Sequence, residues 1–283
     1  MTMYIRGVHD HTVTLPPLVI PASAARRMAK LQRGSIEYIL QHLNSIGQPT
    51  IDGIYASTAL GCLEDTEKFL EETTGPSTSL RSPLPFMRST HNTIAGQLAL
   101  LLKIHGPNIT HSQELFGFHS ALLNALLQCE EEPKSTLLVF AADEETALSR
   151  DLLNALQQHE TLKLGEGYAC FVVGLEPKPT DKAKITLIEQ GAVSDTDHWN
   201  SIITASKAEH IFWSAYPGDA ELPVFPANAK AERYDLETGH HGAQTAQALA
   251  MVCDRLQSEE FDGPCLIIDR FGDTIAIIGV EGC

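Results

Sequence analysis

Residues 89–145 read STHNTIAGQLALLLKIHGPNITHSQELFGFHSALLNALLQCEEEPKSTLLVFAADEE, and this stretch is the clearest guide to the fold. Apolar residues recur at helical spacing in two segments, Ile94, Leu98, Leu101 and Leu102 in the first and Leu115, Phe118, Leu122, Leu123 and Leu126 in the second. Each segment is predicted to be a helix with one buried stripe. A short strand is predicted between them at residues 108–112, after Gly106-Pro107. The apolar run at 137–142, LLVFAA, is bounded by polar and charged residues, as is typical of a strand covered on both faces. The order predicts a layered α/β sheet.

Strand and helix patterns alternate along the rest of the chain. The predicted strands are residues 3–8, 51–58, 166–176, 183–190, 209–214, 265–269 and 274–280. The predicted helices are 23–43, 61–70, 195–207 and 238–256. The strands at 166–176 and 183–190 are expected to form a hairpin, because only a short Pro/Lys/Asp turn separates them. At 283 residues, the chain suits two halves, 1–157 and 158–283, fused on one core.

The charge balance narrows the range of partners. The chain has 20 Lys and Arg against 36 Asp and Glu, a net charge of −16, and its cations form no long stripe. Nucleic acid and anionic membranes are therefore poor partners. An acidic carrier protein would also be repelled, unless it meets the local patch Arg26, Arg27, Lys30 and Arg33. A solvated helix face is the alternative interpretation of that patch.

Neither metal nor membrane signals stand out. The six cysteines form no C-x-x-C pair, which argues against a zinc site or a disulfide framework. The spacing of His91, His105 and His111 matches no metal template, so neither a metal nor another cofactor is expected. No apolar run approaches membrane-spanning length, and the first residues carry no signal-peptide pattern. A cytoplasmic protein is expected.

The order of short motifs resembles the first half of a β-ketoacyl synthase of the thiolase-like fold. The letters that match the family in order are Ser82-Pro83, Ser89-Thr90, Asn92, Ala95-Gly96, Leu98 and Gly106-Pro107. The segment Arg27-Met28-Ala29-Lys30-Leu31-Gln32-Arg33 resembles the family's R-M-x-x-x-x-R element. The resemblance implies duplicated α-β-α-β-α halves with mixed sheets. The C-terminal half is expected to be abbreviated.

The family's nucleophilic cysteine has no counterpart in this chain. The family motif T-A-C-x-S-G corresponds to residues 112–117, SQELFG. Counted without a gap from Gly106-Pro107, the nucleophile position is Leu115, and anchored on Gly117 it is Glu114. The nearest thiol, Cys129, lies about four helical turns further on and cannot substitute.

Gln113 and Glu114 place an amide and a carboxylate next to the expected nucleophile position. This resembles chain-length-factor subunits and decarboxylating loading domains, where glutamine replaces the cysteine. A drifted loop without a role is the alternative interpretation.

The other catalytic groups of the family are partly retained. Tyr216 stands where the family's first histidine lies in A-H-G-T. The second histidine is kept as His240 in Thr238-Gly239-His240-His241-Gly242-Ala243, although Asp235 replaces the lysine normally found five residues earlier. Phe271 belongs to a reduced form of the C-terminal glycine-rich loop. Taken alone, a histidine before a helix of small residues is more typical of a structural or capping role than of a catalytic one, and this is the alternative interpretation of His240.

The resemblance implies a non-catalytic chain-length-factor subunit that pairs with an active ketosynthase in polyketide, polyene or fatty-acid-type biosynthesis. Similar proteins occur in aryl-polyene and flexirubin-type pathways. The expected partner is a ketosynthase subunit, with a homodimer as the alternative, and an acyl carrier protein would be reached through that partner. Residues implied at the tunnel or the interface are Phe86, Met87, Ile109, Thr110, His111, Phe116 and Phe118.

Two alternatives from other classes remain open. One is a malonyl-thioester decarboxylase or unusual condensing enzyme that uses His240 and Gln113. The other is a binding or scaffold protein that kept the thiolase-like fold.

Overall fold

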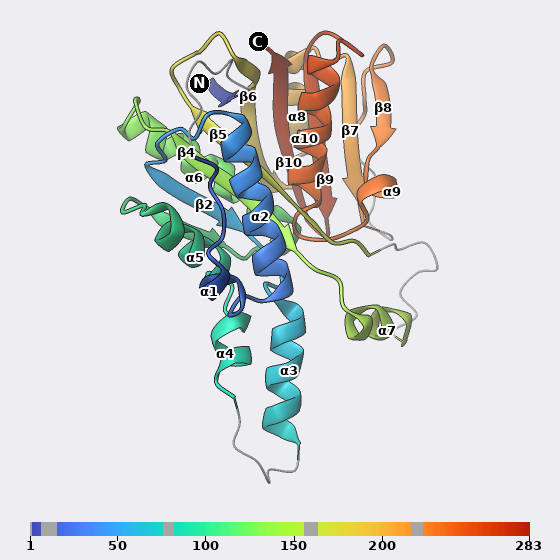
Figure 1. Ribbon diagram of the computed structural model, residues 1–283. Helices are drawn as coiled ribbons and strands as arrows, with labels where there is room; N and C mark the ends of the chain where they lie inside the picture. Colours follow the sequence, from blue (N-terminus) through green and yellow to red (C-terminus); the bar gives the residue numbers. More distant parts are fainter. Residues whose placement is uncertain (1, 7–15, 76–81, 156–163, 217–222) are drawn as a thin grey trace.

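The computed structural model describes residues 2–6, 16–75, 82–155, 164–216 and 223–283 (Figure 1). The strands are β1 (Met3–Arg6), β2 (Gly53–Ser57), β3 (Asn108–His111), β4 (Leu137–Asp143), β5 (Gly167–Gly174), β6 (Asp181–Ala192), β7 (His210–Ala215), β8 (Lys230–Arg233), β9 (Cys265–Phe271) and β10 (Thr274–Gly282). The helices are α1 (Ala22–Ala25), α2 (Lys30–Ser45), α3 (Leu63–Thr74), α4 (Leu84–Ser89), α5 (Thr93–Leu102), η1 (Glu114–Phe116), α6 (Gly117–Glu131), α7 (Ala147–Ala155), α8 (Thr196–Ser206), α9 (Asp235–Thr238) and α10 (Gln244–Gln257).

The strands form one ten-stranded sheet in the order β3-β2-β4-β5-β1-β6-β10-β9-β7-β8. The sheet consists of two sets of five strands, β1 to β5 and β6 to β10. Counted from the outer edge of the sheet inward, both sets follow the same order: the third strand of the set along the chain comes first, then the second, the fourth, the fifth and the first. The strand directions repeat as well, since β2 is parallel to β3 and β4 just as β7 is parallel to β8 and β9. The antiparallel pair β1–β6 joins the two sets. The expected duplicated α/β architecture is therefore present.

The second repeat is the shorter one, as expected. The first repeat runs from Met3 to Gly174, and the second from Asp181 to Gly282. Between β2 and β3 the chain forms α3, α4 and α5, whereas the described residues between β7 and β8 form no helix. Because strand order places β5 in the first repeat, we propose to divide the chain between Gly174 and Asp181 rather than at residue 158.

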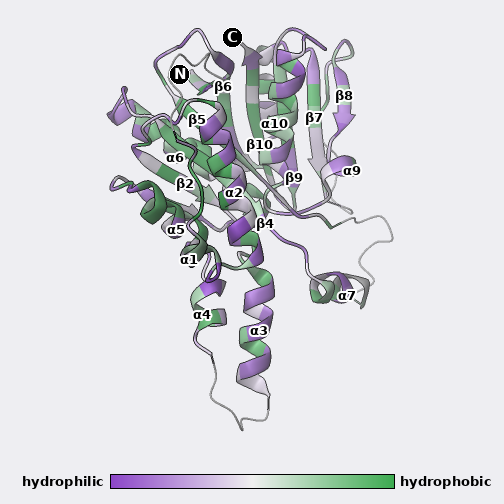
Figure 2. Cartoon of the chain, viewed as in Figure 1, coloured by the Kyte–Doolittle hydropathy of each residue, from purple (hydrophilic) through white to green (hydrophobic). Residues whose placement is uncertain are grey.

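The core lies on both faces of the sheet. All seven residues of β4 are buried, as its apolar run predicts. Leu137, Val139 and Ala141 belong to one hydrophobic cluster, and the alternate residues Leu138, Phe140 and Ala142 belong to another, because successive side chains of a strand point to opposite faces. Helices α6 and α10 take equivalent places in the two repeats and contact each other at the centre. Figure 2 shows hydrophobic residues concentrated on the central strands.

A buried polar network joins the two repeats beside these helices. His119 of α6 lies 3.3 Å, Nε2 to Oδ2, from Asp269 at the end of β9, and both side chains are 1% exposed. Thr245 of α10 donates a hydrogen bond to Asp269 over 3.0 Å, and the Tyr234 hydroxyl donates another. Because a buried carboxylate is costly without partners, this network favours one arrangement of the two repeats.

The predicted hairpin between residues 166–176 and 183–190 is wrong. Strand β1 lies between β5 and β6 and pairs antiparallel with both. The guanidinium of Arg6 holds this arrangement, because its Nη1 donates to the Glu176 carbonyl over 2.7 Å and lies 3.0 Å from the buried Asp181 carboxylate. A strand from the start of the chain thus occupies a position in the sheet that the sequence pattern of neighbouring residues cannot predict.

Three other expectations need correction. The predicted helix 23–43 is two helices, because the backbone at Ala29 is extended and its N–H donates to the Gln32 side chain, which starts α2. The helix predicted from residue 238 begins at Gln244, after Gly239 with a φ of 75°. Leu123, expected in a buried stripe, is 40% exposed. Helices α4 and α7 have no counterpart in the sequence prediction.

An arm projects from the body of the molecule (Figure 1). It consists of α3 and α4, which pack against each other. Phe86 of α4 packs its ring 5.2 Å from that of Phe69 on α3. No helix within the described ranges has the length and apolar character needed to cross a bilayer.

Candidate functional site

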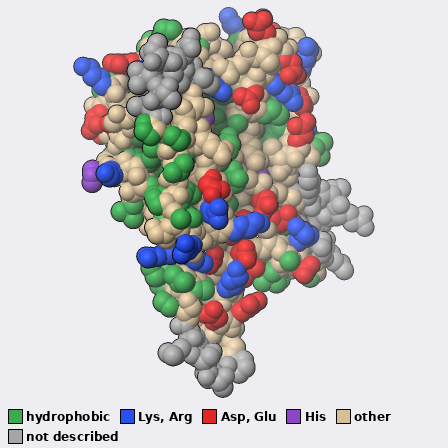
Figure 3. Space-filling view, in the orientation of Figure 1, with side chains coloured by type: hydrophobic (Ala, Val, Ile, Leu, Met, Phe, Trp, Pro, Cys, Tyr) green, Lys and Arg blue, Asp and Glu red, His purple; other side chains and the backbone are tan. Residues whose placement is uncertain are grey.

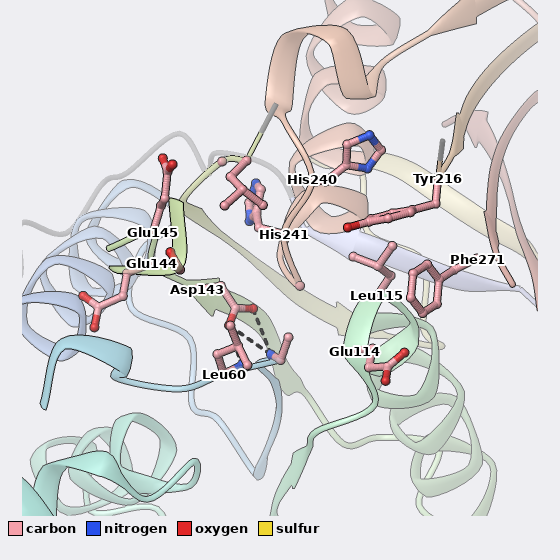
Figure 4. Close-up of a pocket in the computed structure, with 15 residues that line it drawn as sticks. Leu60, Glu114, Leu115, Asp143, Glu144, Glu145, Tyr216, His240, His241 and Phe271 are labelled. Carbon is pink, nitrogen blue, oxygen red and sulfur yellow. Dashed lines mark hydrogen bonds between the residues drawn. The ribbon is translucent and has the colours of Figure 1, made fainter. Parts of the chain in front are cut away.

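A cavity of about 240 Å³ opens where strands of both repeats end. Its lining residues are Ala59, Leu60, Glu114, Leu115, Asp143, Glu144, Glu145, Ser149, Leu164, Gly165, Tyr216, His240, His241, Gly242 and Phe271. The first repeat supplies residues that follow β2 and β4 and that precede α6, and the second supplies residues from the ends of β7 and β9 and the approach to α10. Ligand sites of α/β sheets often lie at such carboxyl ends of parallel strands. Five of the expected site residues, Glu114, Leu115, Tyr216, His240 and Phe271, meet here (Figure 4).

Both candidate nucleophile positions line the cavity, with different orientations. Glu114 has a left-handed backbone, with φ 49°, just before α6 begins. Figure 4 shows Leu115 extending toward Tyr216 and Phe271, whereas the Glu114 carboxylate points away from His240. Leu115 is therefore the side chain that faces the retained histidine.

Gln113 does not line the cavity. Its side-chain oxygen accepts a hydrogen bond from the Ser120 hydroxyl on α6. The structure therefore does not bring Gln113 and His240 into one site. Cys129 lies near the far end of α6 and is fully buried, so it supplies no thiol to the cavity either.

His240 is held by Asp235, the residue that we predicted in place of the family's lysine. Its Nε2 lies 3.0 Å from Oδ2 of Asp235, and the Arg233 guanidinium donates two hydrogen bonds of 2.8 Å to the same carboxylate. Burial disfavours the charged form of Asp235, but the hydrogen bonds from His240 and Arg233 lower the pKa of this carboxyl below its ordinary value. Within the part of the chain that the structure describes, Nδ1 of His240 has no hydrogen-bond partner.

An aromatic group closes the cavity beside His240. The Tyr216 ring lies edge-on to His240 at 5.3 Å and edge-on to Phe271 at 5.1 Å between ring centres. Such edge-to-face contacts are favourable and fix ring positions. Tyr216, which we predicted at the family's first histidine position, therefore places a bulky ring directly beside His240.

His241 is a lining residue that sequence reasoning did not single out. Its Nε2 lies 3.0 Å from Oε1 of Gln247, and the Ala243 N–H donates to its Nδ1 over 3.3 Å. The proton of the neutral ring is thus assigned to Nε2. Burial lowers the pKa of His241 to about 4, so the ring is neutral at pH 7.

Asp143 is a second residue that sequence reasoning missed. It receives hydrogen bonds from the Thr58 hydroxyl at 2.8 Å, the Ala59 N–H at 2.9 Å and the Leu60 N–H at 3.0 Å. Burial raises the pKa of its carboxyl to about 6 although these hydrogen bonds act in the opposite direction. Its sequence signal is its place as the first of three consecutive acidic residues, Asp143-Glu144-Glu145, directly after a buried apolar run. A Cβ at Gly242 would lie 2.3 Å from Asp143 Oδ2, so only glycine lets the chain pass this close.

The β-ketoacyl synthase N-terminal domain family matches residues 8–162, more than half of the chain. This chain belongs to that family. Among curated proteins, none matches it.

Solved structures show the same fold at low sequence identity. The ishigamide ketosynthase/chain length factor is 18% identical with a TM-score of 0.71, over 94% of this chain and 84% of that one. AntDE:AntF, a type II polyketide synthase carrier protein with its ketosynthase, is 13% identical with a TM-score of 0.72, over 100% of this chain and 99% of that one. The ketosynthase ApeO with its chain length factor ApeC, from Xenorhabdus doucetiae, is 15% identical with a TM-score of 0.54, over 93% of this chain and 83% of that one. The fold of this chain is thus the thiolase-like fold of ketosynthases.

The cavity of this ketosynthase-family chain is lined by carboxylates. Glu114, Asp143, Glu144 and Glu145 border it, and no Lys or Arg is among its described lining residues. The lining is therefore acidic, although Arg150 forms an ion pair with Glu145. No group of three or more metal-ligating side chains occurs within the described ranges.

The residues expected at the tunnel or the interface lie in three different parts of the molecule. Ile109, Thr110 and His111 lie on β3, at one edge of the sheet. Phe86 and Met87 are 54% and 60% exposed on the arm. Phe116 and Phe118 are buried within this chain. The ring of Phe118 packs 5.7 Å from that of Phe171 in the core, so Phe118 is not available to a partner.

Proposed function

We propose that this chain is a non-catalytic β-ketoacyl-synthase-like subunit of chain-length-factor type, which pairs with a cysteine-bearing ketosynthase. One observation carries the proposal: the side chain that faces His240 in the cavity is Leu115. A condensing enzyme holds its acyl group as a thioester on a thiolate, and a leucine offers no nucleophile. The Glu114 carboxylate could form only a mixed anhydride, which water cleaves readily.

The rest of the cavity also suits a subunit without condensing activity. Tyr216 and Phe271 fill space beside His240, and His241 is neutral with both ring nitrogens engaged. The alternative function, malonyl decarboxylation by His240 and Gln113, is not supported, because Gln113 is bound to Ser120 outside the cavity. The carboxylates that line the cavity further disfavour a malonyl group, which carries its own negative charge.

The two edges of the sheet differ in a way that supports pairing through β3. Strand β8, at one edge, carries Lys230, Glu232 and Arg233, and charged residues commonly protect an edge against pairing. Strand β3, at the other edge, reads Asn-Ile-Thr-His and carries no Lys, Arg, Asp or Glu.

The surroundings of β3 are apolar. Helices α5 and α6 both contact β3, and they expose Leu100 on α5 and Leu123 and Leu127 on α6. An uncharged edge strand flanked by exposed leucines is a suitable surface for another subunit.

Polyketide or polyene biosynthesis is the proposed setting, because several structural neighbours are ketosynthases described with chain length factors or carrier proteins. The assignment to aryl-polyene or flexirubin-type pigments stays a prediction. Figure 3 shows Lys and Arg side chains gathered across the middle of one face. Arg26, Arg27, Lys30 and Arg33 are exposed where α1 gives way to α2, and we propose that this patch assists an acidic carrier protein that engages the partner.

Mass spectrometry of the intact protein tests the missing acylation step. The chain, incubated with an acyl carrier protein that bears an acyl thioester, should gain no acyl mass, whereas a cysteine-bearing ketosynthase treated in parallel should gain it. The Cys283→Ser variant is the protein to use, because Cys283 is an exposed thiol that could exchange with thioesters. A hydroxylamine-sensitive adduct on that variant would overturn the non-catalytic assignment.

A further inference from the structure

A groove of about 500 Å³ lies on the second repeat, apart from the cavity described above. Its lining residues are Asn200, Thr204, Lys207, Ala208, Val224, Phe225, Pro226 and Asn228. They come from α8, from the turn that follows α8 and from the segment that leads into β8. Val224 in that segment is 77% exposed. The second repeat thus leaves an apolar wall of this groove in water.

In the first repeat, helix α5 fills the equivalent place. This helix leads into β3 and packs against α2, β2 and β3 (Figure 1). Its Ile94, Ala95 and Leu98 side chains are buried. The side chain of Asn108 on β3 donates a hydrogen bond to the Ala95 carbonyl over 3.1 Å. Helix α5 therefore covers the edge strand of the first repeat and the strand beside it.

The second repeat has no helix at the matching position. Because both sets of five strands follow one order, α8 corresponds to α2, and β7 and β8 correspond to β2 and β3. Residues 58–107 join β2 to β3, whereas only residues 216–229 join β7 to β8. The described residues 223–229 form no helix, and residues 216–222 are fewer than the ten of α5. The groove between α8 and the segment that leads into β8 is therefore the place of a missing α5.

The face of β7 and β8 on the side of α8 is less covered than its counterpart. In the first repeat, Ala56 of β2 is 2% exposed and belongs to one hydrophobic cluster with α5. In the second repeat, Trp213 of β7 is only partly buried. Ala231 of β8 pairs with Ile211, whose side chain packs against α8, and is exposed. Phe225 packs 6.5 Å from Trp213, between ring centres. The segment before β8 thus replaces only part of the cover that a helix gives.

We propose that this groove binds an α-helix of another protein, in the place that α5 fills in the first repeat. The bound helix carries apolar residues at positions i, i+1 and i+4, the spacing of the buried residues of α5, and its contact removes Val224 from water. An added strand is not the occupant, because the charged residues of β8 protect that edge against pairing. The site does not rest on the proposed pairing through β3, which is the opposite edge of the sheet.

Fluorescence anisotropy with a peptide of residues 88–105, RSTHNTIAGQLALLLKIH, tests this site, because the peptide carries the buried spacing of α5. The fluorescein-labelled peptide should bind the full-length chain saturably. Val224→Glu in the chain should weaken binding about tenfold, since it places a charge in the contact, and Leu98→Glu in the peptide should do the same. Val19→Glu is the matched control, because Val19 is 69% exposed before α1, and this variant should bind as the wild type does.

The proposal is overturned if the wild-type chain does not bind the peptide saturably, or if the Val224→Glu chain binds it equally well. Hydrogen exchange gives a second measurement, in which the bound peptide should slow the exchange of amides in residues 223–233 about tenfold. Protection confined to other parts of the chain would also overturn the proposal. Self-association of the chain alone that Val224→Glu abolishes would overturn it in favour of a second copy as the occupant.

Discussion

At the scale of single residues, the cavity contains a carboxyl whose titration the fold has altered. Asp143 is 3% exposed, and burial raises its pKa from an ordinary 3.8 to about 6. The folded chain therefore binds this proton more tightly than the unfolded chain does. The contribution of Asp143 to stability is fully present below about pH 4, is lost as the pH rises toward 6, and stays constant above about pH 7.

Asp143→Asn should remove this dependence, because an amide does not titrate. In urea unfolding between pH 4 and pH 7, the free energy of unfolding of the wild type should fall relative to that of the variant by up to about 3 kcal/mol. Glu64→Gln is the matched control with opposite sign, since the hydrogen bond from Lys68 lowers the pKa of Glu64. A difference between wild type and Asp143→Asn that stays level across this range would contradict the assignment.

At the scale of elements, the arm formed by α3 and α4 is the part of the first repeat that extends furthest from the sheet (Figure 1). The apolar side chains of the arm are only partly buried within this chain. Phe86 contacts Phe69 but remains 54% exposed, and Met87 on the same short helix is 60% exposed. We expect such residues to contact a second subunit, and we predict that their bulk limits the length of the chain bound there.

Phe86→Ala should shift the products of the reconstituted pair toward longer chains, because the smaller side chain leaves more room at the tunnel end. The folded chain should lose little stability, since the ring is half exposed. Leu70→Ala, a similar truncation on α3 of the same arm, is the control and should leave the product distribution unchanged. Mass analysis of the products decides the question. Products of wild-type length from an intact Phe86→Ala pair would argue against a gating role.

At the scale of the whole molecule, the alternation of hydrogen bonds along β3 determines which of its backbone groups are free to pair with the proposed partner subunit. The carbonyls of Pro107 and His111 accept hydrogen bonds from Ile54 and Thr58 on the β2 side, at 2.8 and 3.1 Å. Alternate residues of a strand direct their backbone groups to the same side, so Ile109 also faces β2. The backbone groups of Thr110 face the open edge of the sheet.

Proline at these two neighbouring positions should therefore have different effects. Thr110→Pro removes an outward donor and should abolish association with the ketosynthase on size-exclusion chromatography, while the far-ultraviolet dichroism stays near that of the wild type. Ile109→Pro removes a donor to β2 and should instead destabilise the chain by about 3 kcal/mol or more. A Thr110→Pro chain that still elutes with its partner would refute pairing through β3.

The sequence by itself determined the parts of this protein that depend on neighbouring residues. The helical spacing in residues 89–145 and the apolar run before Asp143 predicted α5, β3, α6 and β4. Motif order indicated the family, and the absence of cysteine at residues 112–117 predicted that the family's nucleophile is missing. Periodicity and motifs are local properties, so a single sequence reports them directly.

Only the tertiary structure decided which distant residues meet. Strand β1 lies between β5 and β6, where Arg6 donates a hydrogen bond to Asp181, a residue 175 positions away. Asp143, whose pKa is raised by burial, accepts a hydrogen bond from Thr58, 85 positions away in the loop after β2. Strand order, burial and the direction of each backbone donor are set by packing between segments far apart in the chain. A local pattern carries no information about that packing.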